Sequence, residues 1–161
     1  FMMLAKPDKI QHEKHDFRKL IQDVITLINT QAIMNNISIQ SDISLSLHTV
    51  FCNANQLKQV FLNLIKNAIE AMPDGGTIRI VVRQKNRKNL LVHIIDEGEG
   101  IPEQVLDQLG QPFITTKKNG TGLGLLVSYN IIESHRGEIQ FINQPQGGTK
   151  VTINLPILSH G

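Results

Sequence analysis

Residues 55–72 read NQLKQVFLNLIKNAIEAM, and the period of this stretch predicts an amphipathic helix. Its apolar face consists of Leu57, Val60, Phe61, Leu64 and Ala68. A polar stripe on another face consists of Asn63, Lys66, Asn67 and Glu70. Helix interiors disfavour asparagine, so two asparagines four residues apart require an explanation. Either one amide oxygen is a hard ligand for Mg²⁺, or the stripe only faces solvent.

The motif DEGEG (96–100) follows an apolar run from Leu90 to Ile95 that only His93 interrupts. Asp96 would therefore lie at the end of a buried strand. Its carboxylate there can accept a hydrogen bond from the exocyclic amine of adenine, whereas guanine offers an acceptor at that position. Gly98 and Gly100 would let the backbone approach a flat base without a Cβ in the way. A simple glycine turn after a strand is the alternative.

The glycine run GTGLGL (120–125) opens onto a predicted helix at residues 123–136. It is neither the dinucleotide fingerprint G-x-G-x-x-G nor a P-loop. Free N–H groups at the start of a helix favour phosphate. Lys117 and Lys118 lie just upstream and could add positive charge. A flexible glycine loop explains this motif equally well when it is considered alone.

The order of these motifs predicts one pocket for ATP with its Mg²⁺. A helix that can hold the metal ion comes first, followed by a strand end that can bind adenine. A segment with cations and a helix start that can face phosphate come next. One nucleotide pocket explains all four features, whereas the alternatives require four unrelated coincidences.

Composition narrows the class of protein. The chain has 161 residues, a length that fits one domain. Its formal net charge of +2 does not indicate nucleic acid binding. Cys52 is the only cysteine, so no disulfide can form within the chain and a reducing compartment fits. No stretch approaches the ~18 apolar residues of a membrane span. We therefore expect a cytoplasmic domain without membrane contact. The longer protein to which it belongs could still be anchored in a membrane.

Hydrophobic periodicity predicts an α+β two-layer sandwich with a mixed, mainly antiparallel sheet and helices on one face. Expected helices cover residues 17–35, 55–72 and 123–136, with Asp16 capping the first and Asn53 or Asn55 the second. Expected strands cover 37–43, 48–52, 77–84 and 89–96, followed by a closing hairpin in GEIQFINQ and GTKVTINLP. Residues 98–120 show no period, which is typical of a functional or mobile segment.

These residues resemble the catalytic, ATP-binding domain of bacterial sensor histidine kinases, which shares the Bergerat fold with gyrase, mismatch-repair and heat-shock chaperone ATPases. QVFLNLIKNAIEAM resembles the N box, DEGEGIP the G1 box, PFITTK the F box and GTGLGL the G2 box. GGTKVTINLP resembles the closing strand. The resemblance covers residues 17–157, and the variants NAIEAMPDGG and PFITTK resemble those of nitrogen-regulation and sporulation kinases.

The resemblance implies a role for each matching residue. Asn67 would hold Mg²⁺, and Asn63 would lie near the phosphates. Asp96 would bind adenine with support from Thr149, and the base would lie against Gly98, Gly100 and Ile101. Residues 98–120 would form a mobile lid over ATP. This lid would be anchored by Phe113, with Thr115, Thr116 and Lys117 approaching the phosphates. Backbone contacts to the phosphates would come from Gly120, Thr121, Gly122, Leu123 and Gly124.

Two positions depart from the family. Many relatives carry a lysine three residues after the second asparagine and an aromatic residue next, where this chain has Glu70 and Ala71. Phosphate neutralisation would then fall on Lys117 or Lys66, and base stacking on aliphatic side chains. The hydrolytic ATPases of the superfamily carry glutamate at the position of Asn63, where it acts as general base. Asn63 cannot accept a proton, which favours transfer to a nucleophilic imidazole over hydrolysis.

The resemblance also divides the chain and implies partners. Residues 1–7 would be the tail of a dimerisation and phospho-acceptor helix, 8–16 a linker and 17–158 the catalytic domain. His12-Glu13 lacks the context of the family's acceptor motif, so the acceptor histidine would lie on an upstream domain, and the chain begins as a piece of a longer protein would. A response regulator would act downstream, and the isolated domain would be monomeric. An ATP-sensing or docking module, or an anti-sigma-type serine kinase, is the alternative.

Overall fold

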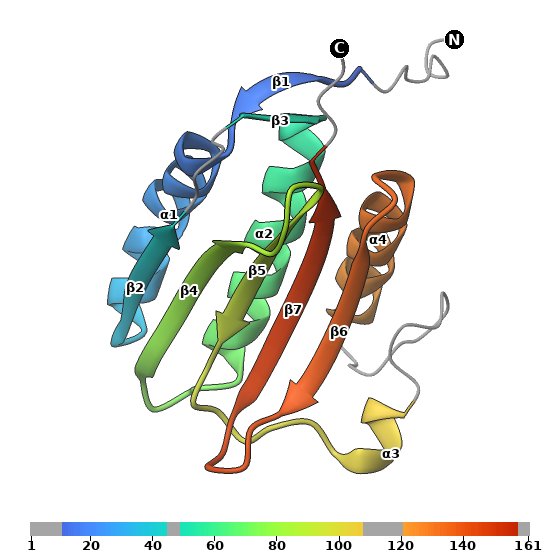
Figure 1. Cartoon of the computed structure of the whole chain (residues 1–161). Helices are drawn as coiled ribbons and strands as arrows, with labels where there is room; N and C mark the ends of the chain where they lie inside the picture. Colours follow the sequence, from blue (N-terminus) through green and yellow to red (C-terminus); the bar gives the residue numbers. More distant parts are fainter. Residues whose placement is uncertain (1–10, 45–48, 108–120, 158–161) are drawn as a thin grey trace, which may run out of the picture.

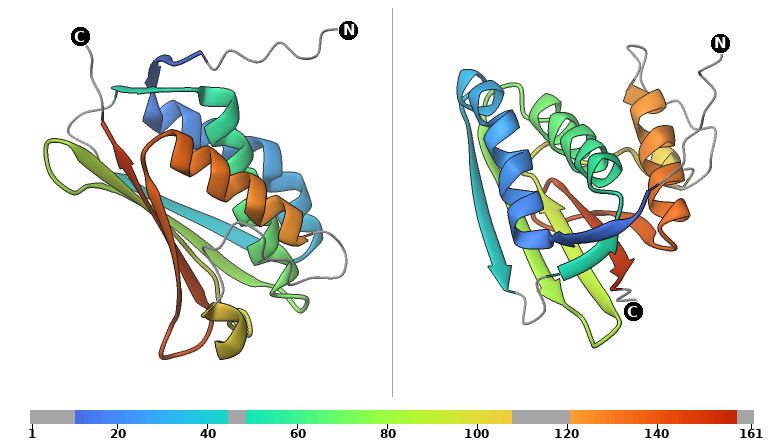
Figure 2. Two further views of the ribbon diagram at one scale, coloured as in Figure 1. Left: turned by 90° about the vertical axis from the view of Figure 1, so that its right-hand side faces the viewer. Right: turned by 90° about the horizontal axis from the view of Figure 1, so that it is seen from above.

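The computed structural model describes residues 11–44, 49–107 and 121–157. Within these ranges the chain forms an open five-stranded sheet, covered by helices on a single face, and a separate two-stranded ribbon (Figures 1 and 2). The predicted tail 1–7 lies outside the described residues. So do the predicted lid residues Phe113, Thr115, Thr116, Lys117 and Gly120.

Five strands form the sheet in the order β2-β4-β5-β7-β6. Their bounds are Ile37–Ser44 for β2, Gly76–Gln84 for β4, Asn89–Ile95 for β5, Thr149–Pro156 for β7 and Glu138–Asn143 for β6. Strand β2 pairs with β4 in parallel, and the other three pairs are antiparallel. The predicted mixed, mainly antiparallel sheet is confirmed.

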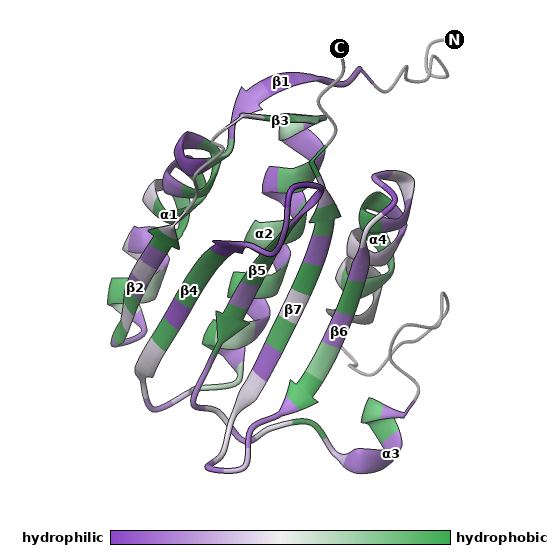
Figure 3. Cartoon of the chain, in the orientation of Figure 1, coloured by the Kyte–Doolittle hydropathy of each residue, from purple (hydrophilic) through white to green (hydrophobic). Residues whose placement is uncertain are grey.

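Three long helices cover one face of the sheet: α1 (Phe17–Met34), α2 (Ala54–Glu70) and α4 (Thr121–Ser134). Alternate residues of the central strands point toward them and are buried, as Ile78, Ile80 and Val82 are on β4. The alternation of hydrophobic and hydrophilic residues along the strands is visible in Figure 3. No helix in the described ranges is long and apolar enough to cross a membrane.

Side-chain caps fix where the first two long helices begin. Asp16 accepts a hydrogen bond from the backbone N–H of Lys19 at 3.2 Å. Asn53 accepts one from the N–H of Gln56 at 3.0 Å, so Asn53 rather than Asn55 caps α2. Loss of such a cap typically costs about 1 kcal/mol of stability. These caps set the register of the polar stripe on α2.

The segment expected to be a linker is partly a strand. Residues Glu13–Asp16 form β1, which pairs with β3 (Thr49–Cys52) in a separate antiparallel ribbon. The sequence HEKHD has no apolar alternation, but backbone pairing with β3 does not require one. Cys52 on β3 is buried, and burial raises the pKa of its thiol to about 11, as expected for a structural cysteine.

Candidate nucleotide-binding site

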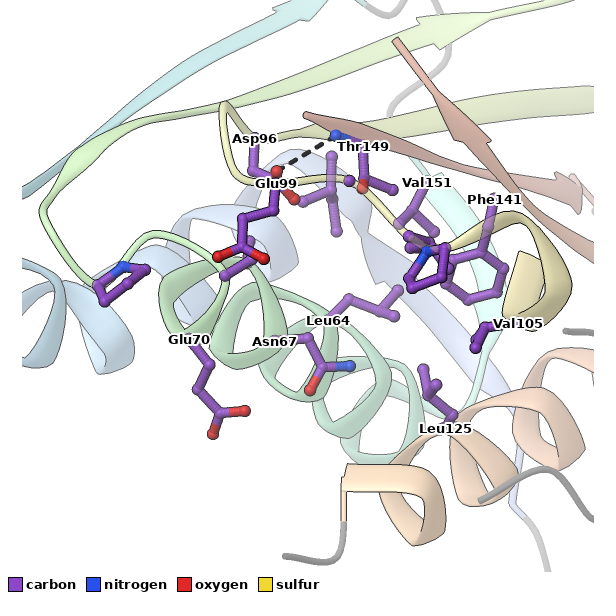
Figure 4. Close-up of a pocket in the computed structure, with 17 residues that line it drawn as sticks. Leu64, Asn67, Glu70, Asp96, Glu99, Val105, Leu125, Phe141, Thr149 and Val151 are labelled. Carbon is purple, nitrogen blue, oxygen red and sulfur yellow. Dashed lines mark hydrogen bonds between the residues drawn. The ribbon is translucent and has the colours of Figure 1, made fainter. Parts of the chain in front are cut away.

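A pocket of about 370 Å³ opens at one end of the sheet, between α2 and the start of α4 (Figure 4). The C-terminal part of α2 and the turn after it contribute Leu64, Asn67, Ala68, Glu70, Ala71 and Pro73. The segment after β5 contributes Glu99, Gly100, Ile101, Pro102 and Val105, the last from the short helix α3 (Glu103–Leu106). The sheet contributes Ile94, Phe141, Thr149 and Val151, Asp96 follows directly after β5, and α4 contributes Leu125.

Asp96 lies directly after β5 and is only 7% exposed. Its Oδ1 accepts hydrogen bonds from the backbone N–H groups of Gly98 at 2.8 Å and Thr149 at 3.2 Å. The N–H of Asp96 donates to the carbonyl oxygen of Thr149 at 2.9 Å. Among the described residues, no hydrogen bond reaches Oδ2. One carboxylate oxygen therefore fixes the side chain, and the other is left for a ligand.

The environment of Asp96 pulls its pKa in two directions. Burial raises the pKa above its usual range, and the N–H groups of Gly98 and Thr149 oppose that rise. The neighbouring Glu97 carboxylate adds a smaller upward shift. A carboxylate that is buried in a pocket and held by backbone donors is a functional-site candidate on physical grounds.

Glycines allow the chain to fold tightly around Asp96. A Cβ on Gly148, which has φ +89°, would collide with the carbonyl oxygen of Asp96. A Cβ on Gly98 would lie 2.5 Å from the carbonyl oxygen of Ala71 at the end of α2. Gly98 therefore packs against α2 and donates to Asp96 rather than lining the pocket, whereas Gly100 (φ +84°) lines it.

The four residues of the polar stripe on α2 do not all face the pocket. Asn67 and Glu70 line the pocket, but Asn63 and Lys66 do not. Asn63 faces α4, with its Nδ2 at 3.5 Å from Ser128 Oγ and beside Gly124. It thus lies next to the first turns of α4, where Thr121 begins the helix. Lys66 is exposed.

The amide of Asn67 is compatible with the predicted metal role. It lines the pocket, is half-buried, and carries a neutral oxygen of the kind Mg²⁺ accepts. The described residues contain no group of three or more His, Cys, Asp or Glu side chains that could hold a metal ion. A cation that takes few protein ligands and keeps phosphate and water oxygens suits such a pocket.

Sequence reasoning missed several pocket residues, and Phe141 is the most consequential. It lies on β6 opposite Val151 of β7, so an aromatic ring faces the space where only aliphatic side chains were expected (Figure 4). The signal was the two-residue alternation of EIQFIN, which puts Ile139, Phe141 and Asn143 on one face of the strand. The sequence did not reveal that this strand would lie beside the pocket.

Residues 52–159 match the model of the family described as histidine kinase-, DNA gyrase B- and HSP90-like ATPase. The chain belongs to this family. Its α+β fold and its resemblance to histidine kinase domains are thereby confirmed, and ATP is the ligand of the family.

Sporulation kinases are among the relatives of this chain. The chain is 45% identical over 157 residues to sporulation kinase E of Bacillus subtilis (strain 168), covering 98% of this chain and 21% of that protein. It is 48% identical over 158 residues to sporulation kinase A of the same organism, covering 96% and 26%. The chain thus spans only about a fifth to a quarter of the length of these relatives.

Solved structures show the same fold. The nucleotide-free catalytic domain of histidine kinase ThkA aligns with a TM-score of 0.81 at 30% identity, covering 92% of this chain and 97% of that one. Histidine kinase ThkA in complex with the response regulator protein TrrA aligns with a TM-score of 0.80 at 26% identity, covering 96% and 44%.

Proposed function

We propose that this chain is the catalytic, ATP-binding domain of a two-component sensor histidine kinase. It binds Mg-ATP and presents the γ-phosphate to a histidine on a dimerisation and phospho-acceptor domain. The observation that carries the proposal is the buried Asp96 carboxylate. One of its oxygens is fixed by two backbone N–H groups, and the pocket around it has the size and apolar lining of a ligand site.

The Asp96 carboxylate is a hydrogen-bond acceptor, which explains a preference for adenine. Its free oxygen accepts the hydrogen bond that the exocyclic amine of adenine donates, whereas guanine would place a carbonyl oxygen against the carboxylate. Ile94, Leu125 and Phe141 supply apolar contacts for the base. Glu70 lies at the pocket where many relatives carry lysine, so Lys117 or Lys66 would neutralise the phosphates.

Phosphoryl transfer requires positioning and charge neutralisation more than covalent help from the protein. Mg²⁺, held through Asn67, would neutralise charge on the phosphate oxygens when it is bound. An imidazole nitrogen of the acceptor attacks the γ-phosphorus, the bond to the bridging oxygen breaks, and ADP leaves. Asn63, beside the start of α4, can donate a hydrogen bond but cannot activate water as a base.

The domain boundaries and partners follow from the same proposal. We assign residues 17–158 to the catalytic domain and residues 1–7, which lie outside the described residues, to the acceptor domain. Residues 8–16 would connect the two, and β1 pairs the end of that connection with β3. The acceptor histidine lies upstream, and a response regulator receives the phosphoryl group, as the ThkA–TrrA pair suggests. The proposed compartment is the cytoplasm.

The proposal is tested first by calorimetric titration of the chain with ATP, with and without Mg²⁺, and with GTP as control. We expect magnesium-dependent ATP binding and no GTP binding. Asp96→Asn keeps an oxygen for the N–H groups of Gly98 and Thr149 but replaces the free oxygen with an N–H donor. It should therefore fold normally and lose roughly 5- to 150-fold in ATP affinity, since one unpaired buried donor costs about 1–3 kcal/mol.

Unchanged affinity in Asp96→Asn would contradict the placement of adenine. A second assay adds the acceptor domain and radiolabelled ATP, and we expect acid-labile phosphohistidine. ATP binding without any transfer in that assay would favour an ATP-sensing module, and phosphoserine would favour the anti-sigma-type kinase.

A further inference from the structure

The backbone of Ile101, which lines the pocket, is held by one side chain from another part of the fold. Asn143, the last residue of β6, donates from Nδ2 to the carbonyl oxygen of Ile101 at 2.7 Å. Its Oδ1 accepts from the N–H of Ile101 at 2.8 Å. Both polar backbone groups of Ile101 are thus paired with a single amide, as a neighbouring β-strand would pair them.

This two-point contact is the main support of a segment that lies outside the sheet. Residues 96–102 have no regular secondary structure, and no backbone-to-backbone hydrogen bond of Gly100 or Ile101 occurs among the described residues. Gly100, at φ +84°, turns tightly around the same amide, since a Cβ there would lie 3.1 Å from Asn143 Oδ1. The amide therefore determines the path of the backbone through Gly100 and Ile101.

Asn143 also belongs to the structure that holds Asp96. Its partner in the β6–β7 ladder is Thr149, whose N–H donates to Asp96 Oδ1. One pair of residues at the end of the ladder thus supports two walls of the pocket. Thr149 fixes the carboxylate, and Asn143 fixes the opposing segment that carries Ile101. Asn143 itself does not line the pocket.

We propose that Asn143 is a positioning residue for adenine binding, acting through Ile101. This inference rests on the proposed function, because it assumes that adenine occupies the space between Asp96 and Ile101. The amide holds the backbone of Ile101 in place at the pocket that Asp96 also lines, so that this wall exists before the nucleotide arrives. Preorganisation of this kind raises affinity by reducing the ordering cost of binding.

The test uses the full chain and three variants. Asn143→Ala removes both hydrogen bonds, and Asn143→Asp keeps the shape and the acceptor but sets a carboxylate oxygen against the carbonyl of Ile101. Asn154→Ala is the matched control, because the Asn154 side chain also makes one amide hydrogen bond in this sheet, to Asn89 at 3.0 Å, away from the pocket. Calorimetry gives the Kd for ATP, ADP and adenosine, and hydrogen exchange gives the protection of the Ile101 amide.

For Asn143→Ala we expect the Kd to rise roughly tenfold for all three ligands alike, because the base is common to them, with faster exchange at Ile101. Asn143→Asp should keep the Ile101 amide protected yet still weaken binding, and Asn154→Ala should change neither. An unchanged Kd in Asn143→Ala, or a loss confined to ATP, would overturn the inference. So would an equal loss in Asn154→Ala. Failure of the unaltered chain to bind any adenine ligand would overturn the proposed function as well, so the two failures are distinct.

Discussion

The residues around Asp96 show which parts of a site a motif can reveal. DEGEG predicted a carboxylate at a strand end next to glycines, and the structure has that arrangement. The motif could not reveal that Gly98 packs against Ala71, or that Gly148 and Thr149 close over Asp96 from a hairpin about fifty residues later. Phe141 and Asn143 were missed for the same reason. A strand pattern gives the face of a side chain but not the element that it will meet.

Gly148→Ala tests how closely the hairpin must approach Asp96. The added Cβ would collide with the carbonyl oxygen of Asp96, and φ is +89°. We expect a loss of about 1–3 kcal/mol in the free energy of unfolding, together with weaker ATP binding. Gly147→Ala is the control, because Gly147 also has a positive φ of +110° but its Cβ would meet nothing within 4 Å. Chemical denaturation and calorimetry measure both effects, and equal losses in the two variants would assign the effect to backbone strain alone.

At the scale of elements, the end of α4 is tied to the start of α2 by His135. The N–H of Asn53, which caps α2, donates to His135 Nε2 at 3.1 Å, and His135 Nδ1 lies 2.9 Å from the carbonyl oxygen of Ile131. The carbonyl can only accept and the N–H can only donate, so the proton sits on Nδ1 and the ring is neutral. The ring centroids of His12 and His135 lie 4.6 Å apart, so the segment before β1 also contacts this junction between α4 and α2.

This junction predicts a pH dependence of stability. Burial lowers the pKa of His135, the bond to Ile131 opposes this, and His12 lowers it further. The unfolded chain therefore binds a proton near pH 6.5 that the folded chain resists. The contribution of neutral His135 to the free energy of unfolding is fully present above pH 6.5. It is lost as the pH falls toward the pKa of His135 in the folded chain. In His135→Gln, which keeps an acceptor but cannot titrate, unfolding free energies measured from pH 7.5 to 5.5 should fall less steeply. An unchanged slope would show that other groups, such as His93, dominate.

Element boundaries were predictable where a cap or a turn residue marks them, as Asp16 does for α1. Sequence period failed for β1 and α3. Strand β1 is polar throughout and exists because β3 offers its backbone, and α3 has only four residues. Neither element is long enough for hydrophobic spacing to identify it.

For the whole molecule, ATP should act as a stabilising ligand, because the pocket proposed for it is lined by residues from α2, β5, β6, β7 and α4 together. At an ATP concentration of a hundred times Kd, binding adds about 2.7 kcal/mol to the free energy of unfolding. For a chain of this size, that corresponds to a rise of roughly 5–10 °C in Tm. Thermal unfolding with Mg²⁺ and ATP, and with GTP as control, measures it. A rise of the same size with GTP would mean that the base is not recognised.

The sequence predicted the closing hairpin of β6 and β7, but it did not predict the order of the whole sheet. Strand β7 follows β6 along the chain but lies between β6 and β5, opposite Asn143 and Ile95 at its first residues. Alternating side chains predict that each strand has a buried face, and they leave its neighbours undetermined.

That order has a consequence for how the protein is made. A ribosome releases the chain from its N-terminus, so β7 emerges after every other strand described here, yet it occupies an interior place in the sheet. Until residues 149–156 are available, β5 and β6 each present an unpaired edge, and Asp96 lacks its contact with Thr149. A nascent chain therefore has no finished pocket, and ATP cannot assist its early folding. During that interval, the open edges of β5 and β6 can pair with strands of other chains, which favours aggregation.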